Sequence, residues 1–253
     1  MSGQTSVRDQ VSEQEWQIRT DLAACYRAIA MYGWDDLVFT HVSVRVPGPD
    51  EHFLINAYGL MFEEMTASSL VKVDLHGEKV MESPFSVNPA GFVIHSAVHE
   101  ARHDAGCVIH THTKAGVAVS VQKGGLLPLS QTSLFPYATL AYHDYEGVAL
   151  NDEEKPRLVS DLGDKQAMIL RNHGLLTTGA SVADAFIMMY LLETACQIQV
   201  MAQSGGGELI EVAAPIVEGI EAQAERVTRG LGGALIWPGL LRKLDRRDPS
   251  YRD

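Results

Sequence analysis

The sequence predicts an α/β fold in which a central sheet carries helices on both faces. Segments with apolar residues at helical spacing interleave along the chain with short apolar or alternating segments that are typical of strands. The 253 residues are 46% apolar, which is enough for a single domain with a substantial core.

The first helix should follow a short polar lead-in. Residues 1–11 are expected to be disordered, and the domain itself is expected to span residues 12–205. Ser12-Glu13-Gln14-Glu15 matches a capping box, in which side chains satisfy the free amides of a helix start. Apolar residues then recur at helical spacing to Tyr32, and Gly33 is a typical helix end.

Three strands are predicted next. Residues 41–46 alternate between apolar and polar side chains, which indicates a half-buried strand whose polar face includes His41. Residues 53–56 and 70–74 have strand composition, and a turn at His76-Gly77 would lead the chain back on itself. The first part of the sheet is therefore expected to be antiparallel.

The middle of the chain should contain a helix, a buried strand and a short helix. Asn88-Pro89 is a good helix opening, because asparagine caps free amides and proline fits the first turn. The helix should run to about Arg102. The strand containing Val108 and Ile109 follows, then a short helix over residues 113–122. Pro128 and Pro136 should bracket a loop or short strand.

The last third is predicted to be mainly helical. A helix over residues 152–162 should precede a buried strand at Met168-Ile169-Leu170, and a second capping box at Ser181 should open a long helix to about Gln203. Residues 206–253 are expected to form a C-terminal helix, near residues 218–230, and a charged tail that pack on the domain.

Charge and cysteine content narrow the partners and the compartment. A formal charge of −12 disfavours nucleic acid and anionic membranes, so a small-molecule or protein partner is expected. Cys25, Cys107 and Cys196 are odd in number and far apart, which favours a reduced, cytoplasmic protein. We find no signal-peptide pattern and no apolar run approaching the roughly 18 residues of a transmembrane helix.

Three histidines are placed so that they can meet. His110 and His112 share one face of a strand, because alternate side chains of a strand point the same way. His173 lies in a turn directly after the second buried strand. Three neutral nitrogen ligands suit zinc, and also iron, manganese or copper. Ordinary core or surface histidines are the alternative. His95 and His99 also share a helix face, where packing is the commoner role.

Two segments hold these histidines, His110-Thr111-His112-Thr113 and Leu170-Arg171-Asn172-His173-Gly174. With the segments around them, they resemble the class II aldolase/adducin family over about residues 15–205. Within it, the adducin-like branch is the most similar. The resemblance implies a three-layer α/β/α fold with a mostly antiparallel sheet, commonly a homotetramer with sites completed at a subunit boundary. It also implies that the three matching histidines bind a divalent metal. The matching segments are His110-Thr111-His112-Thr113, Leu127-Pro128-Leu129-Ser130-Gln131, Leu170-Arg171-Asn172-His173-Gly174, Asn88-Pro89-Ala90-Gly91 with the following Phe92 to Ser96, and Tyr142-His143-Asp144-Tyr145-Glu146-Gly147.

The implied chemistry is that of a lyase. A cation with three protein ligands keeps an open position, as catalytic sites do, and can stabilise the enolate left when a carbon–carbon bond beside a carbonyl breaks. This serves retro-aldol cleavage and decarboxylation equally. We expect zinc, with manganese or iron as alternatives. The competing functions are a non-haem iron oxygenase on the same scaffold and a non-catalytic, adducin-like oligomerisation or binding protein.

Departures from the sugar-phosphate aldolases disfavour a phosphorylated substrate. Alignment through His95 places Gly91 where those enzymes have a catalytic acidic residue, and Pro89 and Ala90 where they have phosphate-binding serines. Thr40-His41 replaces their Gly-Asn, and Tyr58-Gly59 replaces their Thr-Gly. A small non-phosphorylated hydroxycarbonyl compound or hydroxycarboxylic acid is therefore expected.

The missing acid needs a replacement. His143 and Asp144 are candidates, because an imidazole titrates near neutrality, and Tyr142 could donate a proton. The alternative is that this segment is a strand end with ordinary hydrogen bonds. His41 is a further acid–base candidate, and His95, one helical turn beyond Gly91, is a candidate fourth ligand.

Overall fold

The protein is built around one central sheet. The structure is a computed structural model that describes residues 6–148, 152–220, 222–223, 226 and 231–253. Within these residues seven strands pair in the order β3-β2-β1-β4-β7-β6-β5. All neighbouring strands are antiparallel except β5 and β6, which confirms the mostly antiparallel sheet. The strands are β1 (His41–Arg45), β2 (Phe53–Ile55), β3 (Val71–Val73), β4 (Cys107–Thr111), β5 (Leu140–His143), β6 (Ala167–Leu170) and β7 (Gly174–Gly179).

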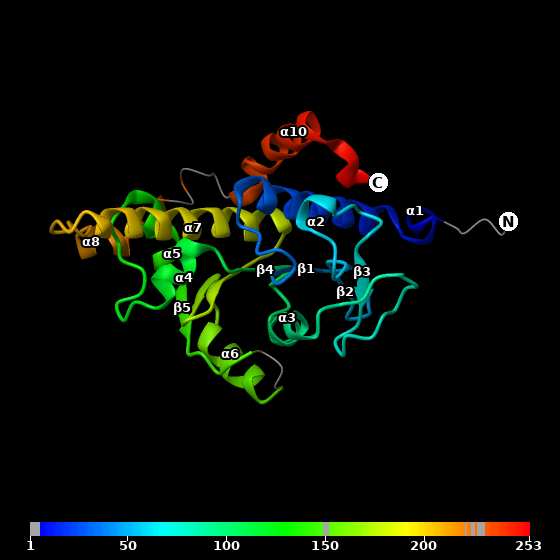
Figure 1. Cartoon of the computed structure of the whole chain (residues 1–253), viewed down its shortest axis with the longest axis horizontal. Coiled ribbons are helices and arrows are strands. Elements are labelled where there is room, and N and C mark those ends of the chain that lie inside the picture. Colours follow the sequence, from blue (N-terminus) through cyan, green and yellow to red (C-terminus); the bar gives the residue numbers. More distant parts are fainter. Residues whose placement is uncertain (1–5, 149–151, 221, 224–225, 227–230) are drawn as a thin grey trace.

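Helices lie on both sides of the sheet (Figure 1). The α-helices are α1 (Val7–Gln10), α2 (Glu13–Tyr32), α3 (Pro89–Ala101), α4 (Lys114–Ser120), α5 (Gln131–Ala138), α6 (Lys155–Leu162), α7 (Val182–Ser204), α8 (Ala214–Glu218) and α10 (Trp237–Arg247). Short 3-10 helices span Phe62–Glu64, Asp152–Glu154, Gly232–Leu235 and Pro249–Arg252.

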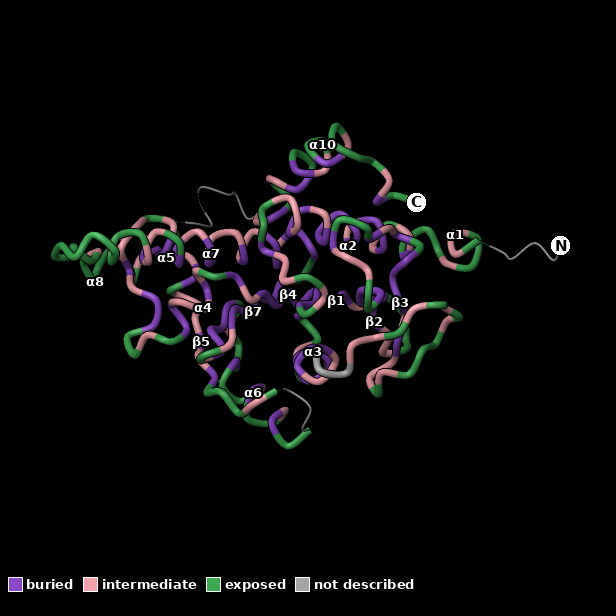
Figure 2. Tube along the Cα trace, in the orientation of Figure 1, coloured by how far each residue is buried: buried purple, intermediate pink, exposed green. Residues whose placement is uncertain are grey.

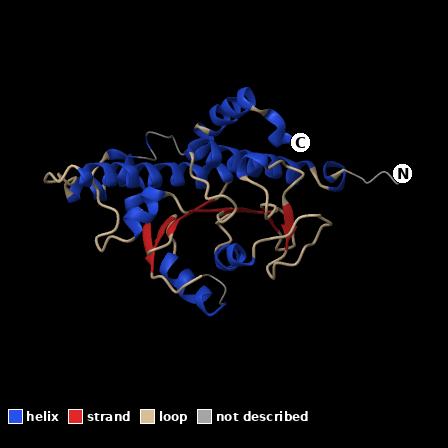
Figure 3. Cartoon of the chain, viewed as in Figure 1, coloured by secondary structure: helices blue, strands red, loops and turns tan. Residues whose placement is uncertain are grey.

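The helices and the sheet make three layers, as predicted (Figure 3). On one face α2 and α7 pack on the sheet through an apolar core that includes Tyr26 and Phe186. On the other face α3 and α6 enclose a second, smaller core that includes Val98 and Leu158. Buried residues accordingly follow the strands and the helix sides that face them (Figure 2). The single α/β domain expected from the sequence is confirmed.

The predicted ends of α2 are confirmed. The Ser12 hydroxyl oxygen accepts a hydrogen bond from the Glu15 amide at 3.1 Å, and Gly33 ends the helix with a φ of 69°. That left-handed conformation favours glycine, which has no β-carbon to clash with the backbone.

Three expectations about local structure are wrong. Residues 7–10 are helical, not disordered, because the Ser6 side chain caps α1 by accepting from the Asp9 amide; residues 1–5 lie outside the described part. Residues 131–138 form α5 where we expected a loop or strand, and Ser130 caps it. β1 is buried on both faces, with His41 and Ser43 only 2% exposed, because α3 covers its polar face.

Helix α7 corrects the statement that no apolar stretch approaches membrane-spanning length. It has 23 residues and is apolar enough to cross a membrane by length and composition. Its apolar side chains, such as Met189 and Leu192, are buried against the sheet. We therefore interpret α7 as a core helix.

The C-terminal segment packs against α2. The Trp237 indole N–H donates to Asp21 at 2.8 Å, and Leu240 and Leu244 are buried beside it. The charged stretch predicted as a tail lies mostly within α10, whose apolar face carries these residues. The helix predicted over residues 218–230 falls largely outside the described residues.

Candidate metal centre

The structure brings the three predicted histidines together at the ends of strands in the middle of the sheet. His110 lies in β4, His112 lies just beyond it, and His173 lies in the turn between β6 and β7. Their ligand nitrogens all lie within 4.8 Å of one another. The ring centroids are 4.7 Å apart for His110 and either neighbour, and 4.8 Å apart for His112 and His173.

Hydrogen bonds on the outer side of two rings fix which nitrogen is free. His110 Nδ1 lies 2.9 Å from the Leu175 carbonyl oxygen, which can only accept, so Nδ1 carries the hydrogen. His112 Nδ1 lies 3.0 Å from a carboxylate oxygen of Asp36, with the same consequence. Both Nε2 atoms therefore present lone pairs, and they are 2.9 Å apart. This donor set fits a divalent cation.

Burial favours the neutral form of His110 and His173. It lowers the pKa of His110 well below the usual range, and the two neighbouring histidines lower it further. Burial, followed by the effect of His112, lowers the pKa of His173 to about 4. A metal ligand must be deprotonated, so both rings are ready to bind a cation at neutral pH.

The turn that presents His173 depends on its neighbours. Asn172 adopts a φ of 57°, a left-handed conformation that asparagine tolerates better than most residues. The His173 amide closes the turn by donating to the Leu170 carbonyl at 3.1 Å. A β-carbon on Gly174 would lie 2.3 Å from the Thr111 carbonyl oxygen, so glycine allows this turn to approach β4.

Asp36 is a site residue that the sequence analysis missed. It lies in the loop between α2 and β1, next to Leu37, whose φ of 51° is unusual for a leucine. No spacing pattern connects it to His112, which is 76 positions later. Only the folded loop reveals that it orients this histidine.

We expect Asp36→Asn to weaken zinc binding by about 10–100-fold, since the carboxylate holds the tautomer of His112 and raises its basicity. The dissociation constant can be measured by competition with a chelator. Asp35→Asn is the matched control, because Asp35 is adjacent but lines a different pocket with Arg27 and Glu63. Equal zinc affinity in Asp36→Asn and the wild type would contradict this role.

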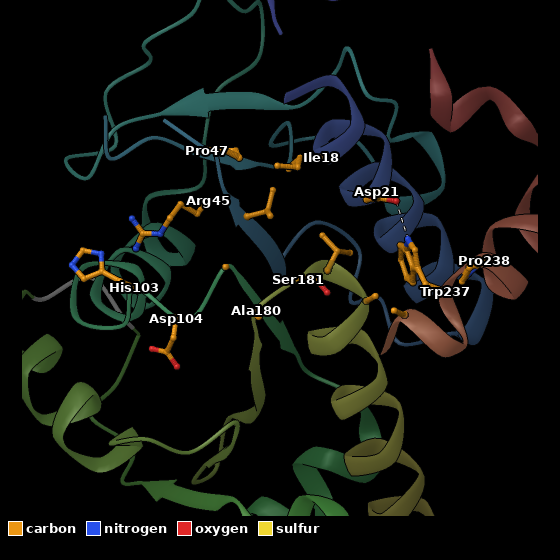
Figure 4. A pocket seen from close by; sticks show the side chains of 15 residues that line it. Ile18, Asp21, Arg45, Pro47, His103, Asp104, Ala180, Ser181, Trp237 and Pro238 are labelled. Carbon is orange, nitrogen blue, oxygen red and sulfur yellow. Dashed lines mark hydrogen bonds between the residues drawn. The ribbon is translucent and has the colours of Figure 1, made fainter. Parts of the chain in front are cut away.

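The three histidines open into a cavity of about 360 Å³. Its lining also includes the apolar side chains of Phe39, Ile94 and Val148, and no lysine or arginine is among its described lining residues. A larger cavity, of about 770 Å³, lies between β1, the start of α7 and Trp237 (Figure 4). His103 and Asp104 line it, but no metal-binding group was found there among the described residues. We therefore place the site at the histidine cavity.

His41 occupies the space that an acidic side chain at position 91 would fill. A β-carbon on Gly91 would lie 2.3 Å from the Cε1 and Nδ1 atoms of the His41 ring. The His41 ring lines the cavity, and neither of its nitrogens has a hydrogen-bond partner among the described residues. Burial, followed by the effect of His112, lowers its pKa to about 4. The glycine and the histidine are thus sterically complementary.

The predicted fourth ligand lies outside the group of three. His95 points its Nδ1 at the Ser43 hydroxyl, 2.7 Å away. Its ring neighbours that of His41, at a centroid distance of 5.9 Å, and it is not part of the metal-binding group found in the described residues.

The residues from 142 to 144 do not line the cavity of a single chain. The Tyr142 hydroxyl accepts from the Leu126 amide at 3.0 Å, and Arg171 lies over its ring. His143 is held by Asp161 at 2.7 Å and by Glu154 at 3.4 Å. Tyr142 and His143 therefore have hydrogen-bond partners outside the cavity. This agrees with the alternative interpretation, in which the segment is a strand end with ordinary hydrogen bonds.

Asp144 and Tyr145 complete this segment. Asp144 is exposed and is not among the lining residues of the cavity, so within one chain its predicted catalytic role has no structural support. Tyr145 instead lines the cavity, with its ring centroid 6.1 Å from that of His173.

Residues 20–200 match the family model of the Class II Aldolase and Adducin N-terminal domain. The chain belongs to the class II aldolase and adducin family. A Pseudomonas aeruginosa protein named "Putative aldolase class 2 protein" is 62% identical over 249 residues, covering 97% of this chain and 96% of that protein. Mouse α-adducin is 48% identical over 194 residues, covering 75% of this chain but only 26% of adducin.

A solved structure extends the comparison to an enzyme of this family. The L-fuculose 1-phosphate aldolase of Glaciozyma antarctica is 30% identical, with a TM-score of 0.78 over 95% of this chain and 93% of that one. The family comprises both lyases and adducins, so its fold alone does not choose between them.

Proposed function

We propose that this family member is a divalent-metal-dependent lyase that cleaves a carbon–carbon bond in a small non-phosphorylated hydroxycarbonyl compound or hydroxycarboxylic acid. Retro-aldol cleavage and decarboxylation both fit. The observation that carries the proposal is the set of three imidazoles that converge on an open cavity. A purely structural role would not need three imidazoles gathered beside a cavity.

The cation would be held by His110, His112 and His173, with zinc the best match to three imidazoles and manganese or iron as alternatives. When bound, it would supply Lewis-acid stabilisation of negative charge developing on a substrate oxygen. Asp36 and the Leu175 carbonyl would keep two of the rings oriented.

The chain would contribute the acid–base group and the dry surroundings. His41 lines the cavity and takes the place of the family's acidic residue. In a retro-aldol cleavage we propose that it accepts the proton of the substrate hydroxyl and then returns that proton to the enolate carbon. Tyr145, at the same cavity, is a second proton donor. Ile94, which is buried in the cavity wall, would keep water from the reacting atoms.

A lack of phosphate-binding groups supports the choice of substrate. A phosphate dianion needs several convergent donors. The described lining of the cavity includes no lysine or arginine, and Pro89, at the start of α3, has no amide hydrogen. Pro89 and Ala90 stand where the sugar-phosphate aldolases have phosphate-binding serines. Losing these two charge-assisted hydrogen bonds, each worth roughly 1.5–3 kcal/mol, would weaken phosphate binding by about a hundredfold or more.

We expect hydroxycarboxylic acids to be cleaved in preference to sugar phosphates. The test is a panel of hydroxy acids, hydroxycarbonyl compounds and sugar phosphates of similar size, offered to the zinc-loaded protein with product formation measured. Fuculose 1-phosphate is the decisive control, because the chain resembles an aldolase named for it. Its efficient cleavage, with hydroxy acids ignored, would contradict the proposal.

We also propose a homo-oligomer, most simply a tetramer, in the cytoplasm. Tyr145 is 52% exposed and Val148 69% exposed, so the mouth of the cavity presents apolar surface that a neighbouring subunit could cover. Light scattering should give several times the mass of one chain. A monomer at working concentration would remove any contribution of a second subunit to the site.

Two other functions remain to be compared with the lyase. An iron oxygenase commonly uses two histidines and a carboxylate, but Asp36 contacts the outer nitrogen of His112, so it is placed to orient a ligand. A non-catalytic binding role is favoured by the 48% identity to mouse α-adducin. Zinc binding without turnover of any compound in the panel would support that role.

A further inference from the structure

A line of buried polar groups leads away from His41 into α3. The Ser43 hydroxyl oxygen lies 2.7 Å from His95 Nδ1 and 2.7 Å from His99 Nε2. His99 Nδ1 lies 3.2 Å from the Ala105 carbonyl oxygen. The three side chains are at most 2% exposed, so within this line water does not compete for their hydrogen bonds.

The Ala105 carbonyl oxygen, at the end of this line, determines which nitrogen of each ring carries a hydrogen. It can only accept, so His99 Nδ1 carries a hydrogen and, in a neutral ring, His99 Nε2 is an acceptor. Ser43 must then donate its hydrogen to His99 and accept from His95 Nδ1. His95 Nε2 is consequently left as a bare lone pair.

Burial supports the neutral rings that this order requires. It lowers the pKa of His99 to about 3, aided by the Arg45 charge, and it lowers the pKa of His95 well below the usual range. Because the line ends at a carbonyl oxygen, which does not take up a proton, it cannot conduct protons to solvent. It can only hold each ring in one tautomer.

The free nitrogen of His95 adjoins His41. His95 Nε2 is buried without a hydrogen-bond partner among the described residues, and so are both nitrogens of His41. The two rings meet edge to face at 82°, with centroids 5.9 Å apart. The His110 and His112 rings, whose nitrogens are 2.9 Å apart, have centroids 4.7 Å apart. An approach of the His41 and His95 rings by about 1 Å would bring their centroids to that shorter distance, at which ring nitrogens lie within hydrogen-bond range.

We propose that Ser43, His99 and the Ala105 carbonyl fix His95 as a hydrogen-bond acceptor, and that His95 thereby positions His41 by taking its ring N–H. The other nitrogen of His41 then faces the cavity as the proton acceptor. Ser43, His95 and His99 are positioning residues. The inference rests on the acid–base role proposed for His41, and it adds how the fold selects the reactive tautomer.

Nitrogen NMR of metal-free protein labelled with 15N-histidine tests this order, because protonated and bare ring nitrogens resonate far apart. Signals are assigned with His41→Gln and His95→Gln. The wild type should show hydrogen on Nδ1 and none on Nε2 in both His95 and His99. Hydrogen on His95 Nε2 would overturn the proposal, and this result needs no variant of Ser43.

The link to His41 is tested by substituting the serine. Ser43→Ala should shift the tautomer balance of His95 and, with it, the ring signals of His41, whereas Ser43→Thr, which keeps the hydroxyl, should restore both. Ser120→Ala is the matched control, because that buried hydroxyl donates to the Val117 carbonyl in α4. Altered His95 signals with unchanged His41 signals would overturn the link.

This outcome is separable from that of the proposed function. The spectra are recorded without metal or substrate, so they test the tautomers of His95 and His99 whether or not the protein has lyase activity. Conversely, a chain that binds zinc and cleaves hydroxy acids, yet shows the wrong His95 tautomer, would overturn the positioning role alone.

Discussion

Replacing His173 with alanine should raise the dissociation constant for zinc by more than about a hundredfold. Four-ligand zinc sites bind with about 10–16 kcal/mol, so losing one of three ligands should cost on the order of 3 kcal/mol. His173 reaches the site through a turn and is only partly buried, so the fold should survive. The affinity can be measured by chelator competition and the fold by circular dichroism.

His103→Ala is the control for this substitution. It removes an exposed imidazole, with a side chain 75% accessible, from outside the group of three. Its zinc affinity should equal that of the wild type. If both variants bind zinc equally well, His173 is not a ligand.

Gly91→Ala should destabilise the wild type but stabilise a His41→Ala variant. In the wild type the new β-carbon would lie 2.3 Å from the His41 ring, and such overpacking typically costs about 1–3 kcal/mol. Without that ring the same change only replaces a helix glycine with alanine, which is worth roughly 0.5–1 kcal/mol in favour of folding. The free energies of unfolding from urea titration should therefore change with opposite signs.

This reversal isolates the contact between the two residues. A double-mutant cycle compares the effect of Gly91→Ala with and without His41, so other consequences of either change cancel. Additive effects would mean that His41 does not occupy the space beside Gly91. The proposal that it takes over from the family's acid would then lose its structural basis.

The fold was predictable where local chemistry and tertiary packing agree. The capping residues Ser12 and Ser181 mark real helix starts, with hydrogen bonds to the Glu15 and Asp184 amides. The alternation of β4 placed His110 and His112 on one side, and the turn after β6 delivered His173. These features depend on residues close together in the chain.

The rest of the site depends on contacts between distant segments. The spacing of Asp36 and His112 in the sequence does not predict their hydrogen bond. The presence of a glycine at position 91 does not predict that the His41 ring fills the space beside it. The polar face of β1 suggested solvent, whereas α3 buries it and turns Ser43 into a link between two histidines. Such partners are set by packing, which sequence periodicity does not encode.

The most direct test of the metal centre is X-ray absorption on the zinc-loaded wild type, combined with metal analysis. One ion per chain should be found, with three imidazole nitrogens at about 2.0–2.1 Å, and the signal should be lost in His110→Ala. Absence of a bound ion after incubation with zinc, or an ion whose nitrogen ligands persist in His110→Ala, would contradict the assignment of the three histidines.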